Sequence, residues 1–311
     1  MNVISVGEVL WDLVGHDEHL GGAPFNFAAH LARLGHTVTF ISALGQDERG
    51  DRILNRMQQM GLSTRYVRSV QEYATGVVTV SLDSAGLPDY VIHRPAAYDF
   101  PQLGDDEIAE LFSTPVDWIY FGTLLQMSPA AKAVTMRLLH AGRESRRFYD
   151  INLRKGSWQP SLVLELMELA TMVKLNVDEA REVSRMLGGS SGSLEKFCRT
   201  YAARFHWQGI CVTNGAQGCA LLWEDEFVEA EGYAVRAKDT VGSGDAFAAA
   251  LLHGLACGWP LMRAADFANR VGAIVASREG AIPGWTIAEV EGLSHNSNSR
   301  SHPESQNRET A

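Results

Sequence analysis

Short runs of β-branched and aromatic residues alternate with longer amphipathic stretches from residue 3 to about residue 290. This alternation is the pattern of a parallel β-sheet covered by helices. Strands are predicted at 3–7, 37–43, 117–121, 147–151, 172–175 and 209–213, and helices at 23–34, 49–60, 129–141, 178–187, 245–257 and 261–277. The sequence therefore predicts an α/β fold, a parallel-rich sandwich with ligands bound at the carboxyl ends of its strands.

One region interrupts this alternation. Residues 75–99, TGVVTVSLDSAGLPDYVIHRPAAYD, contain two strand patterns around a Ser-Ala-Gly-Leu-Pro turn, with no helix between them. They form either an antiparallel edge of the main sheet or a small β lid over a cleft, and the pattern alone does not separate the two. We assign the lid to about 12–22 and 66–99. Residues 294–311 are polar and are predicted to be a disordered tail, so that 1–293 form one domain.

Composition excludes several classes of protein. Of the 311 residues 46% are hydrophobic and 21% are charged, which suits a globular chain and not a disordered or coiled-coil one. The formal net charge of −10 argues against binding to nucleic acid. No apolar stretch is long enough to cross a membrane, and four cysteines without a C-x-x-C pair favour a reduced, cytoplasmic protein.

The segment DTVGSGDAFAAALLHGLACG at 239–258 carries the clearest chemical signal. Backbone N–H groups converge in its Gly242-Ser243-Gly244 turn, and the helix that follows adds the positive end of its dipole, so an anion is favoured there. Asp245 stands beside that anion. The residues alone also allow a plainer interpretation, in which Asp245 caps the helix and the glycines form a tight turn. The segment is neither a Walker A loop nor a dinucleotide fingerprint.

A second segment, GGAPFNFAAHLARLG at 21–35, leads from a Gly-Gly pair into a helix that presents Asn26 in its first turn. An amide can both donate to and accept from a hydroxyl, as a polyol ligand requires. Asp12, just after the first strand, could accept hydrogen bonds from the same ligand. Taken separately, Asn26 and Asp12 are also compatible with purely structural roles at a helix start and a strand end.

Together these segments resemble the two signatures of the ribokinase-like (PfkB) carbohydrate kinases. DINLR at 150–154, KLNVDEA at 174–180 and TNGAQGC at 213–219 follow in the order of that family, so the resemblance covers about residues 3–285. GGAPFN, RPAAYD at 94–99 and DINLR are most similar to fructokinases. The resemblance implies a ribokinase-like three-layer αβα sandwich with a small β lid.

Carried over residue by residue, the resemblance makes Asp245 the base that accepts the proton of the attacking sugar hydroxyl. Gly242, Ser243 and Gly244 would form the anion hole, although Ser243 stands where the family usually has Ala. The sugar would be held by five residues besides Asp245, namely Asp12, Gly22, Asn26, Asn152 and Arg154.

The nucleotide and metal positions are carried over in the same way. Asn176 and Glu179 match the N-x-x-E element that organises Mg²⁺ and its waters. Without the other motifs, the residues alone favour a plainer interpretation, in which Asp178 and Glu179 stabilise a helix N-terminus through its dipole. The implied ATP-binding residues are Asn176, Thr213, Gly215, Gly218, Gly242, Gly244 and Asn269. Asp239 and Val241 match positions that bind a monovalent cation, often potassium, in many relatives.

The resemblance thus implies ATP-dependent phosphorylation of D-fructose to fructose 6-phosphate, with Mg²⁺ and ATP and with K⁺ as a candidate. The alternatives are a ketodeoxy sugar acid, whose carboxylate Arg154 or Arg94 would face, and then ribose or a nucleoside. A protein of a different class, a catalytically silent sugar-binding regulator, would use the same scaffold. We also expect a homodimer that pairs through the lid.

Overall fold

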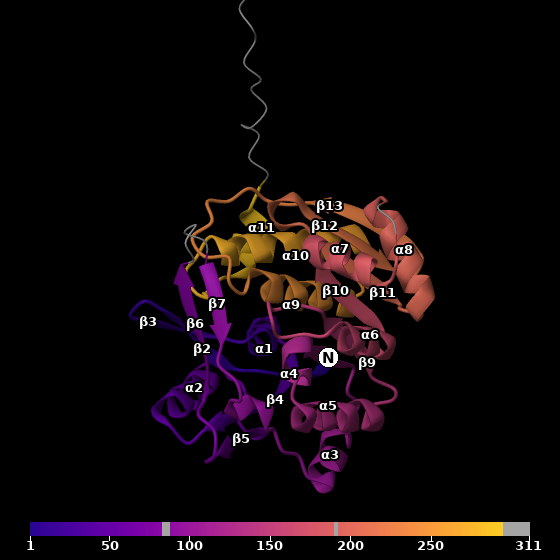
Figure 1. The fold of residues 1–311 in the computed structure, drawn as a ribbon. Coiled ribbons are helices and arrows are strands. Elements are labelled where there is room, and N and C mark those ends of the chain that lie inside the picture. The colour runs from indigo at the N-terminus through magenta and orange to yellow at the C-terminus, as the bar shows by residue number, and fades with distance from the viewer. Residues whose placement is uncertain (83–87, 190–191, 295–311) are drawn as a thin grey trace, which may run out of the picture.

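A computed structural model describes residues 1–82, 88–189 and 192–294. In this part of the chain a nine-stranded sheet carries helices on both faces, and a separate four-stranded sheet lies beside it (Figure 1). The turn predicted after residue 82 and the predicted tail beyond residue 294 lie outside the described residues.

The large sheet has the strand order β13-β12-β11-β10-β9-β8-β1-β4-β5. All neighbouring strands from β11 to β5 are parallel, and antiparallel pairing occurs only where β12 and β13 extend one edge. The carboxyl ends of the parallel strands therefore meet at a single edge of the sheet. In chain order the strands are β1 (Asn2–Val6), β4 (Thr37–Gly45), β5 (Val67–Val70), β8 (Trp118–Gly122), β9 (Arg146–Asp150), β10 (Met172–Asn176), β11 (Gly209–Thr213), β12 (Gly218–Trp223) and β13 (Glu226–Glu231).

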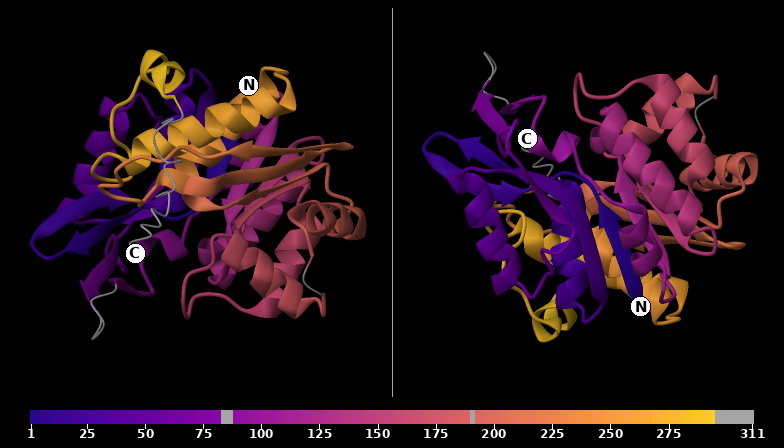
Figure 2. Two further views of the ribbon diagram at one scale, coloured as in Figure 1. Left: turned by 90° about the horizontal axis from the view of Figure 1, so that it is seen from above. Right: turned by 90° about the horizontal axis from the view of Figure 1, so that it is seen from below.

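Helices cover both faces of this sheet. Successive residues of a strand point to opposite faces, so Val3 of β1 joins one apolar core and Ile4 joins the other. The first core packs under α1 (Ala23–Arg33), α2 (Glu48–Gln59), α9 (Ser243–Ala256), α10 (Leu261–Ala276) and α11 (Ile287–Gly292). The second packs under α3 (Asp105–Leu111), α4 (Thr123–Gln126), α5 (Pro129–Ala141), α6 (Pro160–Leu169), α7 (Val177–Met186) and α8 (Leu194–Phe205). Figure 2 shows the resulting three layers, which confirm the predicted sandwich.

The small sheet contains the strands predicted in the irregular region. Its order is β3-β2-β6-β7, with β2 (Leu10–Val14), β3 (Asp17–Gly21), β6 (Gly76–Leu82) and β7 (Pro88–Ile92). The β2–β6 pair is parallel, and the two outer pairs are antiparallel. Because β6 and β7 pair with β2 and not with the large sheet, this region is a separate element and not an edge of the main sheet.

Each of the twelve predicted helices and strands is present within two residues of its predicted bounds. One detail of the lid was wrong: residues 67–70 form β5, which pairs with β4 in the large sheet, where Val67 and Val70 are buried. Asp12 follows the first strand as predicted, and it lies within β2, opposite His19 of β3, and not at a strand end. The short helices η1 (Ala97–Asp99) and η2 (Gly215–Gln217) complete the fold.

Within the described ranges, the longest apolar helices fall short of what a membrane crossing needs.

Candidate active site

A cavity of about 650 Å³ lies at the carboxyl edge of the large sheet, between the start of α9 and the small sheet. Leu10, Val78, Tyr90 and Ile92 of the small sheet form part of its wall, so that sheet is placed as a lid would be. The cavity brings together most of the site residues predicted from the sequence, namely Asp12, Gly22, Asn26, Asn152, Arg154, Asn176, Glu179, Thr213, Val241, Gly242, Gly244 and Asp245.

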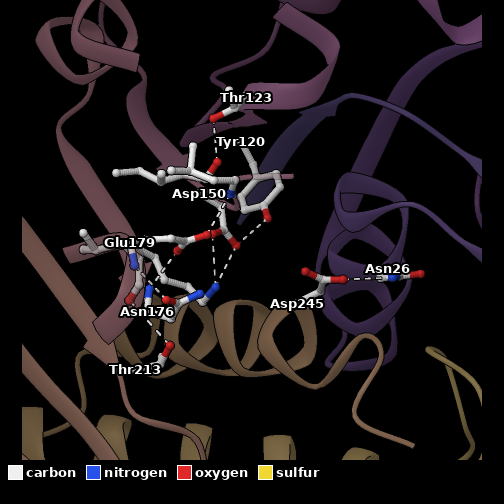
Figure 3. Close-up of polar contacts among 12 residues, drawn as sticks. Asn26, Tyr120, Thr123, Asp150, Asn176, Glu179, Thr213 and Asp245 are labelled. Atoms are coloured by element: carbon white, nitrogen blue, oxygen red, sulfur yellow. Dashed lines mark hydrogen bonds and ion pairs between the residues drawn. The ribbon is translucent and has the colours of Figure 1, made fainter. Parts of the chain in front are cut away.

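Asp245 is fixed in the first turn of α9 and faces Asn26 of α1. Asn26 Nδ2 donates to Asp245 Oδ2 over 2.8 Å (Figure 3). The Asp245 residue is only 7% exposed, and burial raises the pKa of its carboxyl to about 6, with the charge of Asp150 adding to the effect. Asn26 Oδ1 is buried without a hydrogen-bond partner among the described residues. Two segments 219 residues apart thus place a carboxylate and an open amide acceptor side by side.

The start of α9 is shaped to receive an anion. Gly242 precedes the helix with φ 75°, a left-handed conformation that glycine adopts without strain. Within the described ranges, the N–H groups of Gly242 and Gly244 have no backbone hydrogen-bond partner. The Ser243 N–H instead donates to the Thr240 carbonyl over 3.3 Å, and the Ser243 hydroxyl bonds the same oxygen. Two of the three predicted donors are therefore available at the positive end of the helix dipole.

Asn176 and Glu179 form a capping box at the start of α7. Asn176 Oδ1 accepts from the N–H groups of Asp178 and Glu179, each over 2.9 Å. Glu179 accepts from the Asn176 N–H over 2.8 Å and from the Leu153 N–H over 2.7 Å. Asp178 and Glu179 also lie in the first turn of α7, so the favourable acidic charge predicted at a helix N-terminus is present as well. Each Glu179 oxygen also keeps a second lone pair, so this hard oxygen set suits Mg²⁺ that retains its waters.

The end of the cavity beside the small sheet is rich in carboxylates. Burial raises the pKa of Glu8 to about 7 and that of Asp12 to about 6, and Glu8 Oε2 has no hydrogen-bond partner among the described residues. Gly22 has φ 110°, and a Cβ there would lie 2.5 Å from the Glu8 carbonyl oxygen. Glycine is thus required where the chain passes between the small sheet and α1. Arg154 lines the same space and partly offsets the charges of both carboxylates.

Five predicted positions do not line the cavity: Asp239, Gly215, Gly218, Ser243 and Asn269. Asn269 Nδ2 donates to the carbonyls of residues 230 and 231, and a Cβ on Gly218 would lie 2.0 Å from the Ala230 carbonyl oxygen. Both residues therefore lie against β13. Asp239 accepts from the N–H groups of Val241 and Gly280 over 3.0 Å each, and so joins two loops beside α9.

Sequence reasoning missed an ion pair on the cavity wall. Lys174 and Asp150 belong to the motifs KLNVDEA and DINLR, but neither received a role. Lys174 Nζ lies 3.1 Å from Asp150 Oδ1 and 2.9 Å from Oδ2, and the Tyr120 hydroxyl donates to Oδ2 over 3.0 Å (Figure 3). A lysine between Val173 and Leu175, in a strand whose other buried residues are apolar, was the signal that could have revealed it.

The fold and the cavity together define a class: an α/β scaffold in which a helix start with available backbone N–H groups lies beside a buried carboxylate. Comparison with protein families matches residues 7–288 to the pfkB family of carbohydrate kinases. The chain belongs to this family and is a sugar kinase of the ribokinase-like fold.

Individual relatives agree with this assignment. A fructokinase of Escherichia coli is 28% identical over 84% of this chain and 87% of its own length. A crystal structure of fructokinase with bound ATP from Xylella fastidiosa has a TM-score of 0.82 at 22% identity, covering 93% of this chain and 97% of that one. A fructokinase from Vibrio cholerae O395, in fructose, ADP and calcium ion bound form, has a TM-score of 0.80 at 23% identity, covering 94% and 98%.

Proposed function

We propose that this sugar kinase transfers the γ-phosphoryl group of ATP to the 6-hydroxyl of D-fructose. The observation that carries the proposal is Asp245, a buried carboxylate at the start of α9, which shares one cavity with unpaired backbone N–H donors. Support comes from the fructokinases among the relatives. It also comes from the acidic side chains of the cavity, which can accept hydrogen bonds from the hydroxyls of a neutral sugar.

In the proposed reaction the hydroxyl oxygen forms a bond to the γ-phosphorus while the bond to the β–γ bridging oxygen breaks. The electron pair of the broken bond stays on ADP, and Asp245 accepts the hydroxyl proton. The Gly242 and Gly244 N–H groups hold the phosphoryl oxygens, on which charge is spread in a loose transition state. Asn26, hydrogen-bonded to Asp245, keeps the carboxylate aligned with the acceptor hydroxyl.

Asn176 and Glu179 are the residues that would hold Mg²⁺ and its waters, and the ion would supply charge neutralisation for the ATP phosphates. The structures of relatives with bound nucleotide record ATP, or ADP with calcium or potassium ions. We extend ATP and divalent-cation binding to this chain on that basis. The potassium site at Asp239 and Val241 and the cytoplasmic location stay predictions.

The cavity favours a neutral sugar over a sugar acid. Arg94, one of two cations considered for a carboxylate, forms an ion pair with Asp99 and donates to the Leu124 carbonyl over 2.9 Å. Glu8, Asp12 and Asp245 would repel a carboxylate. Among the cations that line the cavity, Arg154 already faces these three acidic groups and Lys174 is paired with Asp150. A neutral polyol therefore fits the site better than a ketodeoxy acid.

The proposal is tested by measuring ADP release from Mg-ATP against fructose, ribose, ketodeoxygluconate, adenosine and mannose, with and without potassium. We expect turnover on fructose to exceed turnover on the others. Turnover on another sugar alone would replace the substrate and keep the mechanism. Absence of turnover with every acceptor, in protein that still binds ATP, would favour the silent sugar-binding regulator.

The rate should depend on pH through Asp245. Its pKa of about 6 means that the carboxyl is protonated, and unable to act as a base, at lower pH. We expect kcat/KM to fall about tenfold per pH unit below 6, and faster if protonation of Glu8 and Asp12 also weakens sugar binding. Initial rates between pH 5 and 8.5 measure this profile. A rate that does not change between pH 5 and 7 would contradict the base role.

We also propose that two chains pair through the small sheet. Of the large hydrophobic side chains exposed in the described ranges, Val14, Tyr90 and Val91 lie on this sheet and are 45%, 46% and 47% exposed. Sedimentation equilibrium at micromolar concentration should give twice the chain mass of 34.1 kDa. Val91→Glu should give a monomer, whereas Met262→Glu, equally exposed but on α10, should not. A wild-type monomer would reject the dimer.

A further inference from the structure

Lys174 and Asp150 lie directly opposite each other in the register of β10 and β9. Their side chains are 8% and 1% exposed, and the lysine amine approaches both carboxylate oxygens. Burying two charges is expensive, and an apolar pair in such a position is often at least as stable as an ion pair. Stability alone therefore gives little reason for a lysine and an aspartate in the middle of this sheet.

The aspartate is held in one orientation by its surroundings. The Tyr120 hydroxyl donates to Asp150 Oδ2 over 3.0 Å, and the Phe27 ring stacks on Tyr120 with 3.7 Å between ring centroids. Phe27 follows Asn26 in α1, and the Asn26 side chain donates to Asp245 of α9. The network thus fixes the lysine amine relative to the base of the reaction.

The lysine amine has one donor left over. An ammonium group carries three N–H donors, and the two bonds to Asp150 account for two of them. Within the described ranges Lys174 Nζ has no other hydrogen-bond partner. Lys174 lines the cavity beside the start of α9, where a Cβ built on Gly244 would lie 3.6 Å from Nζ. The remaining donor is therefore at the anion hole, and a buried donor is costly to leave unpaired.

We propose that Lys174 is a further catalytic residue, whose third N–H contacts an oxygen of the phosphoryl group during its transfer. Asp150 and Tyr120 are positioning residues that aim this donor. The inference rests on the proposed function, since it assigns a role in that reaction. Lys174 stays protonated throughout: the hydroxyl proton goes to Asp245, and the electron pair of the broken P–O bond goes to ADP. Its contribution is a fixed positive donor for charge that spreads over the phosphoryl oxygens.

The first test compares Lys174→Met with Lys132→Met, which removes a surface lysine paired with Glu165. We expect Lys174→Met to lower kcat about 100-fold, the effect of losing one donor to a developing anion, with the KM of the sugar little changed. Lys132→Met should keep wild-type kinetics. A kcat for Lys174→Met within threefold of wild type would overturn the proposal.

A double variant separates catalysis from folding, because Lys174→Met alone leaves Asp150 buried without its partner. Asp150→Asn combined with Lys174→Met removes both charges, and its melting temperature should recover toward the wild-type value. We expect its kcat to stay about 100-fold low. Recovery of kcat together with stability would show that the pair is only structural.

The affinity for a transition-state analogue, compared with the affinity for ADP alone, would not change selectively if Lys174 were only structural. With fructose present, Lys174→Met should bind ADP with aluminium fluoride about 100-fold more weakly than wild type, and ADP alone within threefold. Equal weakening of both would overturn the proposal.

Wild-type turnover is measured first, on fructose and then on the other sugars. If the wild type phosphorylates none of the sugars, both the proposed function and the role of Lys174 are rejected. If the wild type is active and Lys174→Met is unaffected, only the role of Lys174 is rejected.

Discussion

Asp245→Asn should lower kcat about 1,000-fold, within the range that removal of a general base produces. The amide has nearly the shape of the carboxylate and can still bond Asn26, but it cannot accept the proton of the sugar hydroxyl. In the proposed mechanism phosphate binding rests on the backbone of Gly242 and Gly244, so the dissociation constant of ATP should stay within about threefold of wild type. Steady-state rates and an ATP titration measure the two quantities.

The same substitution should make the protein more stable at neutral pH. The pKa of Asp245 is raised from 3.8 to about 6 in the folded state, which means that folding disfavours the charged carboxylate. This cost is complete above pH 6, shrinks as the pH falls, and is gone below 3.8. Asp245→Asn should therefore melt at a higher temperature than wild type at pH 7.5, and the gain should disappear near pH 4.

Asp105→Asn is the matched control, because Asp105 is a surface carboxylate paired with Arg137. It should leave kcat unchanged. Near wild-type turnover in Asp245→Asn would remove the base role. Loss of ATP binding along with turnover would instead indicate that the substitution disturbs the start of α9.

Gly242→Ala should abolish most activity by reshaping the anion hole. A Cβ on Gly242 would lie 2.6 Å from the Ala281 carbonyl oxygen and 2.7 Å from its Cα, so backbone must move. The position also has φ 75°, which costs about 1–3 kcal/mol for a residue with a side chain. We expect kcat/KM for ATP to fall at least about 100-fold, together with a lower melting temperature.

Gly258→Ala separates the conformational cost from the clash. Gly258 follows the other end of α9 with φ 63°, and a Cβ there would meet nothing within 4 Å. This variant should lose about 1–2 kcal/mol of stability and keep wild-type kinetics. If Gly242→Ala keeps wild-type kcat/KM, the Gly242 and Gly244 N–H groups do not form the phosphate site.

The sequence predicted the fold because its strands and helices are locally consistent. Buried parallel strands such as β8, in which all five residues are buried, give apolar runs that stand out between amphipathic helices. The lid was harder to predict, because β2 mixes Leu10 and Trp11 with Asp12, and its partner β6 lies more than sixty residues away. Pairing over such a distance leaves no local signal in a single sequence.

The site was predicted where a residue type has a special chemical or conformational use, as at Asp245, Gly242 and Asn26. Lys174 and Asp150 were missed because their pairing depends on the register of two neighbouring strands. Asn269 and Gly218, which the resemblance places with the nucleotide, lie against β13 in this structure, where Asn269 donates to two backbone carbonyls. Their contacts with a nucleotide stay predictions.

The central claim is that the γ-phosphoryl group goes to the 6-hydroxyl of fructose. It is tested most directly by incubating the enzyme with Mg-ATP and D-fructose and identifying the product by ³¹P–¹H correlation NMR. We expect one phosphomonoester, whose phosphorus couples to the protons on C6, formed in equal amount to ADP. Phosphate on another hydroxyl, or ADP accompanied only by inorganic phosphate, would contradict the claim.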